Sequence, residues 1–528
     1  MHGFDIRVKI TIFASLNGYP ATSKMEKEEK HDKKELNGYE RTIKYMGVLG
    51  GTQSLSILLG IVKTKFTTKL LGPSGLGIIA MYSRTLQMLS DYTNLSLSFS
   101  AVRQIAEAHE EGNQEKLLYW IKVLRSWAFL TAVAGVFLAI VLYPFLGEWM
   151  FEGNDYYTSR FLLLSPVVGF MAIIGGELAI LKGVHSLYKV ARYTLWTALA
   201  GLVISVPLYF CMGIAGIFPA IFLTSFLQMI VLLCYSLPMY PYSITPFSRR
   251  VLRDGLDMVK FGIGYIFAAI MGSSSTWLVC NALLDLGNDT VVGFYSTAMT
   301  LMSLLPGILH ASIDSDYYPR LSSVNKDAVA MNRMVNEQAE VQLLIQTPML
   351  LAYLLMIQIL VPILYDFELM AAVPITQLAL FGMFIRTMTY PISYLPLACG
   401  DSKIFILQEV VYDVIYVLLV ICGYKFGGLV GVGAAVAIAY FLEWIIVCII
   451  AFLKYRFTLS ERLIKCFAMQ LPMFLLMLFV TQIFKGGVIY WASGALIAVV
   501  SAIMSFYVLS KRLSLIKYLI GRIKRIIK

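Results

Sequence analysis

The sequence predicts an all-α polytopic membrane protein with about fourteen transmembrane helices, built as two six-helix units and a C-terminal helix hairpin. Of the 528 residues, 58% are hydrophobic and only 14% are charged, and the mean hydropathy is +0.73. Soluble domains carry about 25% charged residues, so the composition indicates a membrane protein. Long apolar runs recur along the chain, and Lys and Arg gather in alternate connections between them.

The first 44 residues form a polar segment that ends where the first apolar run begins. Its stretch "KMEKEEKHDKKEL" mixes charges of both signs and cannot bury enough apolar surface to fold alone. We therefore expect residues 1–44 to be a disordered cytoplasmic tail. The apolar stretch near Met1 is too short for a cleaved secretory signal, and Met1 and Met25 both stand as candidate translation starts.

Apolar runs of about 20 residues, the length that a helix needs to cross a bilayer, follow this tail. They cover about 45–69, 75–102, 120–146, 160–182, 191–211, 214–237, 259–284, 291–317, 341–364, 373–398, 404–423, 429–452, 463–483 and 488–509. They predict an N-terminal six-helix bundle at 45–237, a cytoplasmic linker at 238–258, a C-terminal six-helix bundle at 259–453, an extra helix hairpin at 463–509 and a basic interfacial tail at 510–528.

The cations divide the connections into two alternating sets. One set is rich in Lys and Arg, as at Arg249, Arg250 and Arg253, whereas the other is short and mainly acidic, as at Asp285 and Asp289. Cytoplasmic loops carry an excess of Lys and Arg, so we expect the basic set and both termini in the cytoplasm. The basic tail spaces its apolar residues as an interfacial helix on anionic lipid does.

An internal repeat predicts how the two units are related. "TKLLGPSGLGIIAMYSRTLQML" (68–89) and "NALLDLGNDTVVGFYSTAMTLMSLL" (281–305) both place a small turn between two apolar runs. The displacement from Gly72 to Gly287 equals that from Gly216 to Gly431, and it covers six predicted helices. An even number of spans predicts parallel repeats with a substrate path between them. Glycine-rich turns also recur in unrelated bundles, so chance similarity stays open as the alternative.

The segments "KFTTKLLGPSGLGIIAMYSRTLQML", "VRQIAE", "AILKGVHSLYKVA" and "YYPRLSS" resemble the Wzx-type O-antigen flippases of the multidrug/oligosaccharidyl-lipid/polysaccharide (MOP) exporter superfamily. The resemblance covers about 45–455. It implies two MATE-like six-helix bundles around a central cavity. It also implies translocation of polyprenyl-pyrophosphate-linked oligosaccharide repeat units across the bacterial inner membrane by alternating access. The extra hairpin is like that of the fourteen-helix members, which include lipid II flippases.

Four cations within the predicted helices are candidates for substrate binding: Lys63, Lys65, Arg84 and Arg386. A cation inside a bilayer is costly unless it faces protein or water, so its position suggests a function. Lys and Arg can replace the water around a pyrophosphate with charge-assisted hydrogen bonds. We therefore expect these cations to line a path for an anionic lipid-linked sugar. For Lys65, snorkelling to the surface is the alternative.

Polar stripes along the helices support a hydrated path. Arg84, Gln87 and Asp91 are spaced by threes and fours on one helix face, and a similar stripe runs along 291–317. Polar contacts between helices would also explain one such stripe. Acids that are candidates for H⁺ or Na⁺ coupling or for pairing with a cation are Asp91, Asp314, Glu409 and Asp413. Arg386 either faces the cavity or pairs with Glu409 or Asp413, and the alternative role of Arg84 is to pair with Asp91.

The sequence predicts no metal site, catalytic site or nucleic-acid partner. The seven cysteines are scattered singly, no GxxxxGK[ST] motif occurs, and the cations lie in short connections. A cation-coupled multidrug exporter of the same superfamily and a membrane enzyme of glycan assembly stay open as alternatives. The expected partners are a lipid-linked oligosaccharide, membrane lipid, and polysaccharide polymerase and chain-length regulator proteins.

Overall fold

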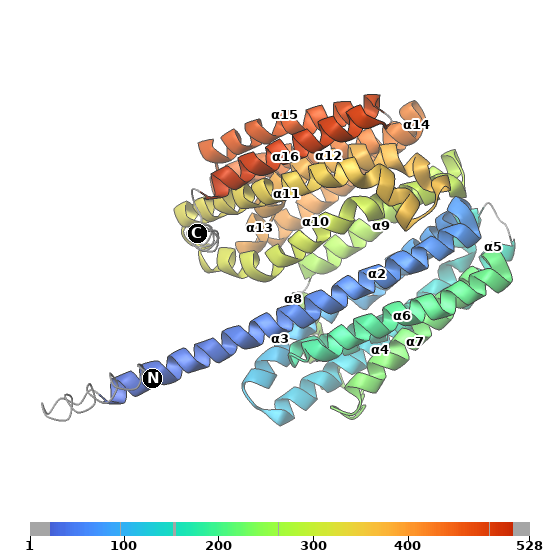
Figure 1. The fold of residues 1–528 in the computed structure, drawn as a ribbon. Coiled ribbons are helices and arrows are strands. Elements are labelled where there is room, and N and C mark those ends of the chain that lie inside the picture. The colour runs from blue at the N-terminus through green and yellow to red at the C-terminus, as the bar shows by residue number, and fades with distance from the viewer. Residues whose placement is uncertain (1–21, 96, 152–154, 262, 485, 511–528) are drawn as a thin grey trace, which may run out of the picture.

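The computed structural model is all-helical and describes residues 22–95, 97–151, 155–261, 263–484 and 486–510. Two helical bundles lie against each other, the N-terminal one running from blue to green and the C-terminal one from yellow to red (Figure 1). We call them the N-terminal half and the C-terminal half.

The N-terminal half consists of α2 (Thr22–Asn94), α3 (Leu97–Glu110), α4 (Gln114–Phe151), α5 (Asp155–Gly183), α6 (Leu187–Met212), the 3₁₀ turn η1 (Gly213–Gly216) and α7 (Ile217–Ser236). α2 turns back on itself at Gly72, whose φ of 66° and ψ of −173° are not helical. A positive φ favours glycine, and Pro73 directly after it restarts the helix. α2 therefore contributes two antiparallel segments to the half.

The C-terminal half follows α8 (Arg249–Phe261). It consists of α9 (Ile263–Leu286), α10 (Asp289–Ser323), α11 (Ala328–Leu364), the 3₁₀ turn η2 (Phe367–Ala371), α12 (Ala372–Ser393), α13 (Leu395–Ala398) and α14 (Ser402–Tyr455), with the hairpin α15 (Glu461–Ile483) and α16 (Val488–Ser510) on its outer side. α14 turns back at Gly428, where φ is 55° and ψ is −141°. The hairpin is tied to α11, since the Tyr490 hydroxyl donates to the Leu355 carbonyl at 2.9 Å.

Nine helical stretches of the described residues are long and apolar enough to cross a membrane. Two of them, Tyr188–Ser236 and Ser402–Tyr455, each contain a turn between two helices, because η1 separates α6 from α7 and Gly428 divides α14. The prediction of a polytopic, all-α membrane protein is thus confirmed, whereas the number of crossings stays a prediction.

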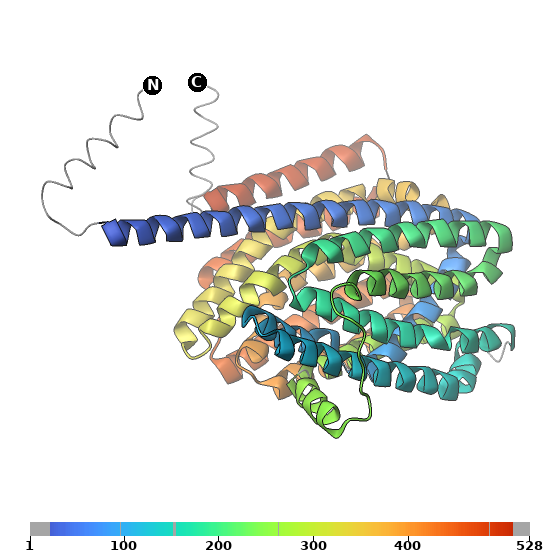
Figure 2. The same ribbon diagram turned by 90° about the horizontal axis from the view of Figure 1, so that it is seen from below.

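The beginning and the end of the chain differ in what the structure describes. α2 begins at Thr22, so residues 22–44 are helical where the sequence predicted disorder, and they extend beyond the bundle (Figures 1 and 2). Glu26 and Lys30, like Glu29 and Lys33, stand four residues apart, a spacing that favours a helix. Residues 1–21 and most of the predicted basic tail, 511–528, lie outside the described residues.

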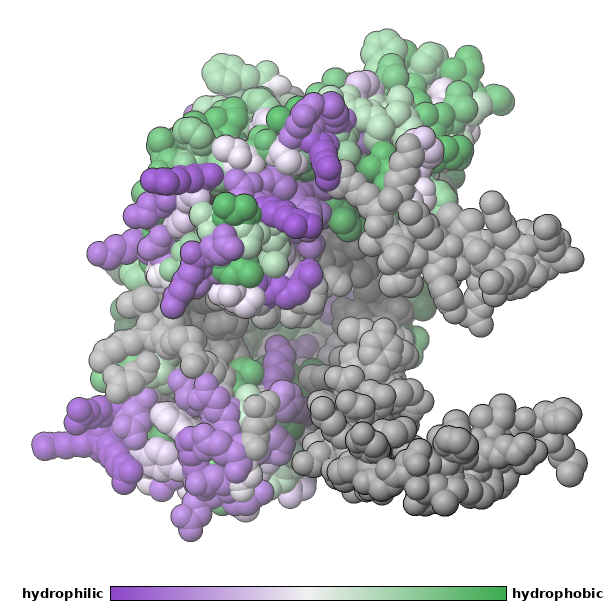
Figure 3. All heavy atoms as spheres, turned by 90° about the vertical axis from the view of Figure 1, so that its left-hand side faces the viewer, coloured by the Kyte–Doolittle hydropathy of each residue, from purple (hydrophilic) through white to green (hydrophobic). Residues whose placement is uncertain are grey.

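The helices define two ends of the molecule. One is the Gly72 end, where α2 and α14 turn back and where α5, α7, α10 and α12 begin; the other is the linker end, which holds α8. Hydrophilic side chains gather on both halves at the linker end, while the flanks are largely hydrophobic (Figure 3). This distribution fits a membrane that surrounds the flanks of the bundles.

A buried ion pair fixes the linker to the N-terminal half. Arg125 on α4 and Glu177 on α5 are 2% and 1% exposed, and Nε and Nη2 of Arg125 donate to the two carboxylate oxygens of Glu177 at 2.7 and 3.0 Å. The remaining Nη1 donates to the linker carbonyls of Tyr240 and Pro241 at 3.0 and 2.8 Å. Trp127 Nε1 donates to the Val251 carbonyl of α8 at 3.2 Å. The linker and α8 therefore belong to the N-terminal half.

We predict that Arg125→Gln destabilises the protein by about 3–5 kcal/mol, because it leaves the Glu177 carboxylate buried and unpaired. Thermal unfolding of the purified full-length protein in detergent measures this loss. Lys116→Gln is the control, since it breaks the exposed ion pair of Lys116 with Glu111 (2.7 Å), worth about 0–1 kcal/mol. Equal losses of stability in the two variants would contradict a stabilising role of the buried Arg125–Glu177 pair, which we call the Arg125–Glu177 clamp.

Candidate functional site: a polar pocket between the two halves

A polar pocket of about 350 Å³ lies where α2 of the N-terminal half meets α10 of the C-terminal half. Its lining residues are Thr64, Leu76, Ile79, Ala80, Ser83, Arg84, Gln87, Ser296, Thr297, Thr300 and Tyr365. Hydroxyls and one amide alternate with small apolar side chains, and Arg84 is the only charged residue in this lining set. The polar stripes of the second segment of α2 and of α10, which the sequence singled out separately, thus face each other across the pocket.

Arg84 is half-buried and has no acidic partner. It makes no hydrogen bond or ion pair with any residue within the described ranges. Its charge instead acts on Cys280 of α9, Tyr295 of α10 and Tyr416 of α14. The hydroxyls of Tyr295 and Tyr416 are 2.7 Å apart and satisfy each other. The guanidinium therefore keeps its five N–H donors available for a ligand.

Asp91 lies on the same face of α2 as Arg84, but it does not hold Arg84. The Gln87 amide donates to Asp91 Oδ1 at 2.9 Å. Gln87 thus stands between the cation and the acid. This arrangement disfavours an intrahelical Arg84–Asp91 pair.

The two lysines of α2 point away from the pocket. Lys63 lies against Gly201 of α6, and its Nζ would be 3.5 Å from a methyl group at that position, with Thr224 of α7 close by. Lys65 Nζ donates to the carbonyl of Pro362, near the C-terminal end of α11. This carbonyl lacks an intrahelical partner because the helix ends at Leu364. The structure thus brings neither lysine to Arg84.

Arg386 lies in the C-terminal half, among acids and tyrosines of α14. Its Nη1 donates to the Tyr440 hydroxyl at 2.9 Å, with the guanidinium 4.9 Å from the centre of that ring, and its charge acts on Glu443 and Glu409. Arg386 Nε and Glu443 Oε2 are buried without a hydrogen-bond partner, so among the described residues the printed polar contact of Arg386 is with Tyr440 and with no acid. Glu443 was not among the acids preferred from the sequence, since its place beside Arg386 depends on the turn of α14 at Gly428.

Of two further predicted acids, Asp413 lies apart from the pocket. Asp413 is 5% exposed and accepts a hydrogen bond from Ser275 of α9 at 2.9 Å, while its Oδ2 is buried without a partner. Asp314 falls within α10, but its side chain lies outside the described residues. Sequence reasoning missed Tyr365, which joins the pocket because it directly follows the end of α11, and no pattern marks such a residue in advance.

The two halves are in close contact at the Gly72 end. A methyl group on Gly77 of α2 would lie 1.9 Å from the Asp289 carbonyl oxygen, and one on Gly293 of α10 would lie 2.1 Å from the Pro73 carbonyl oxygen. Pro73 and Asp289 are 216 positions apart, as are Gly77 and Gly293, so the contact is reciprocal between the two repeats. The Ser74 hydroxyl donates to Asp289 Oδ2 at 3.0 Å, and Lys65 adds its bond to α11. We call this contact the glycine seal.

We predict that Gly77→Ala or Gly293→Ala separates the halves at the Gly72 end, because a Cβ cannot fit against the opposing carbonyl. Cysteine accessibility at Ser74, measured with a membrane-impermeant maleimide in Ser74→Cys variants, should rise several-fold. Gly60→Ala on the same helix is the control, since nothing lies within 4 Å of that position. Unchanged accessibility in both seal variants would show that the contact does not close this end.

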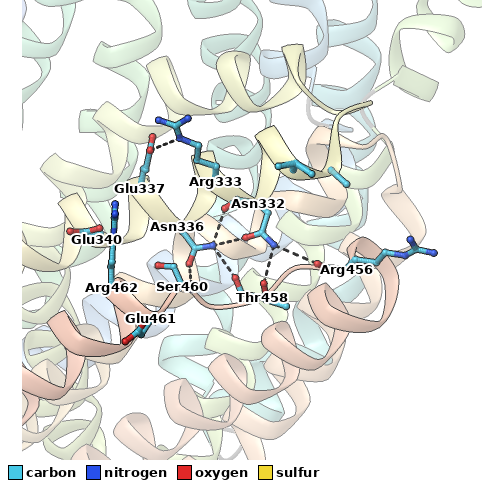
Figure 4. A pocket seen from close by; sticks show the side chains of 12 residues that line it. Asn332, Arg333, Asn336, Glu337, Glu340, Arg456, Thr458, Ser460, Glu461 and Arg462 are labelled. Atoms are coloured by element: carbon cyan, nitrogen blue, oxygen red, sulfur yellow. Dashed lines mark hydrogen bonds and ion pairs between the residues drawn. The ribbon is translucent and has the colours of Figure 1, made fainter.

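A second pocket, of about 750 Å³, lies at the linker end between α11 and the connection from α14 to α15 (Figure 4). Three of its charged side chains form ion pairs within their own helices: Arg333 pairs with Glu337 at 2.8 Å, and Glu461 pairs with Lys465 at 2.6 Å. The Asn336 amide donates to the Thr458 carbonyl at 2.9 Å. These contacts hold the hairpin connection against α11, so we assign the pocket a structural role.

Comparison of the sequence with known proteins identifies a family. A sequence model of the family described as "Polysaccharide biosynthesis protein" matches residues 43–325, slightly more than half of the chain. No curated protein sequence matches the chain.

Solved structures of two kinds of transporter share the fold. The lipid II flippase MurJ in an inward closed conformation aligns with a TM-score of 0.63 and 14% identity, over 88% of this chain and 98% of that chain. An inward-facing MATE-family multidrug resistance transporter of the MOP superfamily aligns with a TM-score of 0.61 and 11% identity, over 76% of this chain and 94% of that chain. The MATE multidrug transporter DinF-BH aligns with a TM-score of 0.53 and 17% identity, over 76% of this chain and 95% of that chain. The predicted MATE-like fold is thereby confirmed.

Proposed function

Because the chain belongs to the polysaccharide biosynthesis protein family, we propose that it translocates polyprenyl-pyrophosphate-linked oligosaccharide repeat units across the bacterial inner membrane. Such units would serve the synthesis of O-antigen or another surface polysaccharide. The observation that carries the proposal is the unpaired Arg84 guanidinium in the pocket between the halves. A cation there gains from a ligand that brings a negative charge, and the surrounding hydroxyls and amide suit sugar or phosphate oxygens.

The same pocket argues against export of organic cations. Such a ligand needs carboxylates or open aromatic faces, and the lining set contains no acid and a single aromatic residue, Tyr365. Polysaccharide polymerase and chain-length regulator proteins are the partners that this pathway would require. They act on the unit after it has crossed the membrane.

The glycine seal supports transport by alternating access. When the two halves touch at the Gly72 end, a pocket between them is accessible from the linker end. Separation of the glycine seal would make the pocket accessible from the Gly72 end instead. We place the linker end in the cytoplasm, since its connections carry the excess of Lys and Arg, with both termini on that side. About fourteen crossings follow if α2 and α14 each cross twice and α10 crosses once. Reporter fusions at Ser248 and Lys326 that signalled the outer side would contradict this topology.

We further propose that the acids around Arg386 couple translocation to H⁺ or Na⁺ movement. Glu409, Asp413 and Glu443 lie on α14, and buried oxygens of Asp413 and Glu443 lack a partner. These acids lie within one half, as expected of a site that is reached separately from the substrate pocket.

We predict that Asp413→Asn removes the dependence of transport on the ion gradient while the protein still binds its substrate. Dissipating the proton gradient with an ionophore should then inhibit wild-type protein and leave the variant, already slow, unchanged. Asp401→Asn is the control, because Asp401 accepts from Tyr455 at 2.8 Å at the linker end, away from this cluster. Full ionophore sensitivity of the Asp413 variant would exclude it from coupling.

Arg84 gives the test of the proposed substrate. We predict that Arg84→Gln reduces surface glycan at least about tenfold, the effect of losing one charge-assisted bond of about 1.4 kcal/mol, and that lipid-linked repeat units accumulate in the cytoplasmic leaflet. Arg84→Lys should retain part of the activity. Glycan blots and extraction of lipid-linked units from a flippase-deficient strain carrying each variant measure both effects.

The double variant Arg84→Gln with Asp91→Asn separates ligand binding from helix pairing. Asp91 is bonded to Gln87, so its neutralisation restores no positive charge to the pocket and should not rescue export. Recovery of wild-type glycan in the double variant, at equal protein level, would mean that Arg84 serves packing and does not contact substrate.

A further inference from the structure

Tyr365 is a second residue of the pocket between the halves whose polar group has no partner among the described residues. It directly follows the end of α11 and is 7% exposed, and its hydroxyl forms no hydrogen bond within the described ranges. A buried tyrosine hydroxyl usually has a partner, as Tyr353 of α11 has in the Leu301 carbonyl at 2.9 Å. Protein does not enclose the Tyr365 oxygen completely, so it reaches the space that the residue lines.

Tyr365 and Arg84 lie at different depths of the pocket. Glu368, three residues after Tyr365, places Oε2 3.4 Å from where a methyl group on Gly72 would stand. Three residues before Tyr365, a backbone carbonyl accepts from Lys65, which precedes that glycine by seven residues, or about 10 Å of helix. Arg84 follows the same glycine by twelve residues, or about 18 Å of helix. The tyrosine therefore lies on the side of the glycine seal, and the guanidinium lies on the side of the linker end.

We propose that Tyr365 contacts the sugar of the lipid-linked unit while Arg84 binds its pyrophosphate. This inference rests on the proposed function and adds a second residue and an orientation to it. A glycosyl pyrophosphate separates its negative charge from its ring hydroxyls, and the pocket separates a guanidinium from a phenol in the same order. The Tyr365 hydroxyl can donate to or accept from a sugar hydroxyl, and its ring provides apolar surface for the C–H groups of the sugar.

A ligand bound in this way contacts both halves, because Arg84 belongs to α2 and Tyr365 belongs to the C-terminal half. While the glycine seal is closed, the pocket is filled from the linker end, so the sugar enters ahead of the phosphate. When the seal separates, the sugar already faces the end that opens and leaves first. The ligand therefore passes through the pocket without turning round in it.

The affinity of purified full-length protein for two short-chain probes tests this assignment. The probes are diesters of farnesyl pyrophosphate, one capped with a methyl group and the other with N-acetylglucosamine, so they share their charge and lipid and differ in the sugar. We expect isothermal titration to show about tenfold tighter binding of the sugar-bearing probe to wild type. Tyr365→Phe should reduce this preference about threefold, the effect of one neutral hydrogen bond, and Tyr365→Leu should abolish it.

Two matched variants control for changes outside the pocket. Tyr353→Phe removes the other tyrosine hydroxyl of this region, which is bonded to a backbone carbonyl. Phe367→Leu removes a ring that is 74% exposed, two residues after Tyr365 and outside the lining set. Both variants should keep the full preference for the sugar-bearing probe. A loss in either control as large as that in the corresponding Tyr365 variant would overturn a specific contact.

The two probes also separate this inference from the proposed function. Arg84→Gln should weaken the binding of both probes and keep the ratio between them. Unchanged binding of both probes in Arg84→Gln would contradict the anionic substrate itself. Weakened binding in Arg84→Gln, together with a full sugar preference in Tyr365→Phe and Tyr365→Leu, would overturn only the role of Tyr365. Tyr365→Phe, which keeps the ring, decides the matter if Tyr365→Leu does not fold.

Discussion

The unpaired charge of Arg84 is the constraint on which the rest of the structure depends. A guanidinium between two membrane-embedded bundles is costly unless it is hydrated or neutralised. The protein surrounds it with hydroxyls of both halves. Because Gln87 separates it from Asp91, the cation stays available. An anionic ligand can therefore form the favourable electrostatic interaction with Arg84 that an internal acid would otherwise form.

The repeat architecture explains how such a site can be exposed at one end at a time. The second segment of α2 and the first turns of α10 cross through Gly77 and Gly293, each against the other's preceding turn. Contacts of this kind are broken or made as a unit, because neither helix has a side chain at the crossing that could adjust. On the linker side, the Arg125–Glu177 clamp joins α8 to the N-terminal half, so the halves can move as two bodies connected between α8 and α9.

The sequence predicted what depends on local spacing. The stripe of Arg84, Gln87 and Asp91 follows from steps of three and four residues. The sequence repeat also predicted which segments of the two halves correspond, because its displacement differs by a single residue from the displacement between Gly77 and Gly293 in the glycine seal. It did not predict the directions of Lys63 and Lys65, since residues two apart on a helix point to nearly opposite sides. One of them packs against α6 and the other reaches a carbonyl 297 residues away. Partners of that kind depend on how helices pack, and no pattern along the chain encodes them.

Reconstitution measures the central claim most directly. Purified protein in liposomes, given a fluorescent polyprenyl-pyrophosphate-linked oligosaccharide in the inner leaflet, should expose about half of the label to an impermeant quencher on the outside as the two leaflets equilibrate, as expected of a transporter that reverses between two open ends. Protein-free liposomes should expose almost none. Label that stays protected with the protein present, while an organic cation dye crosses instead, would contradict a flippase and support the multidrug exporter.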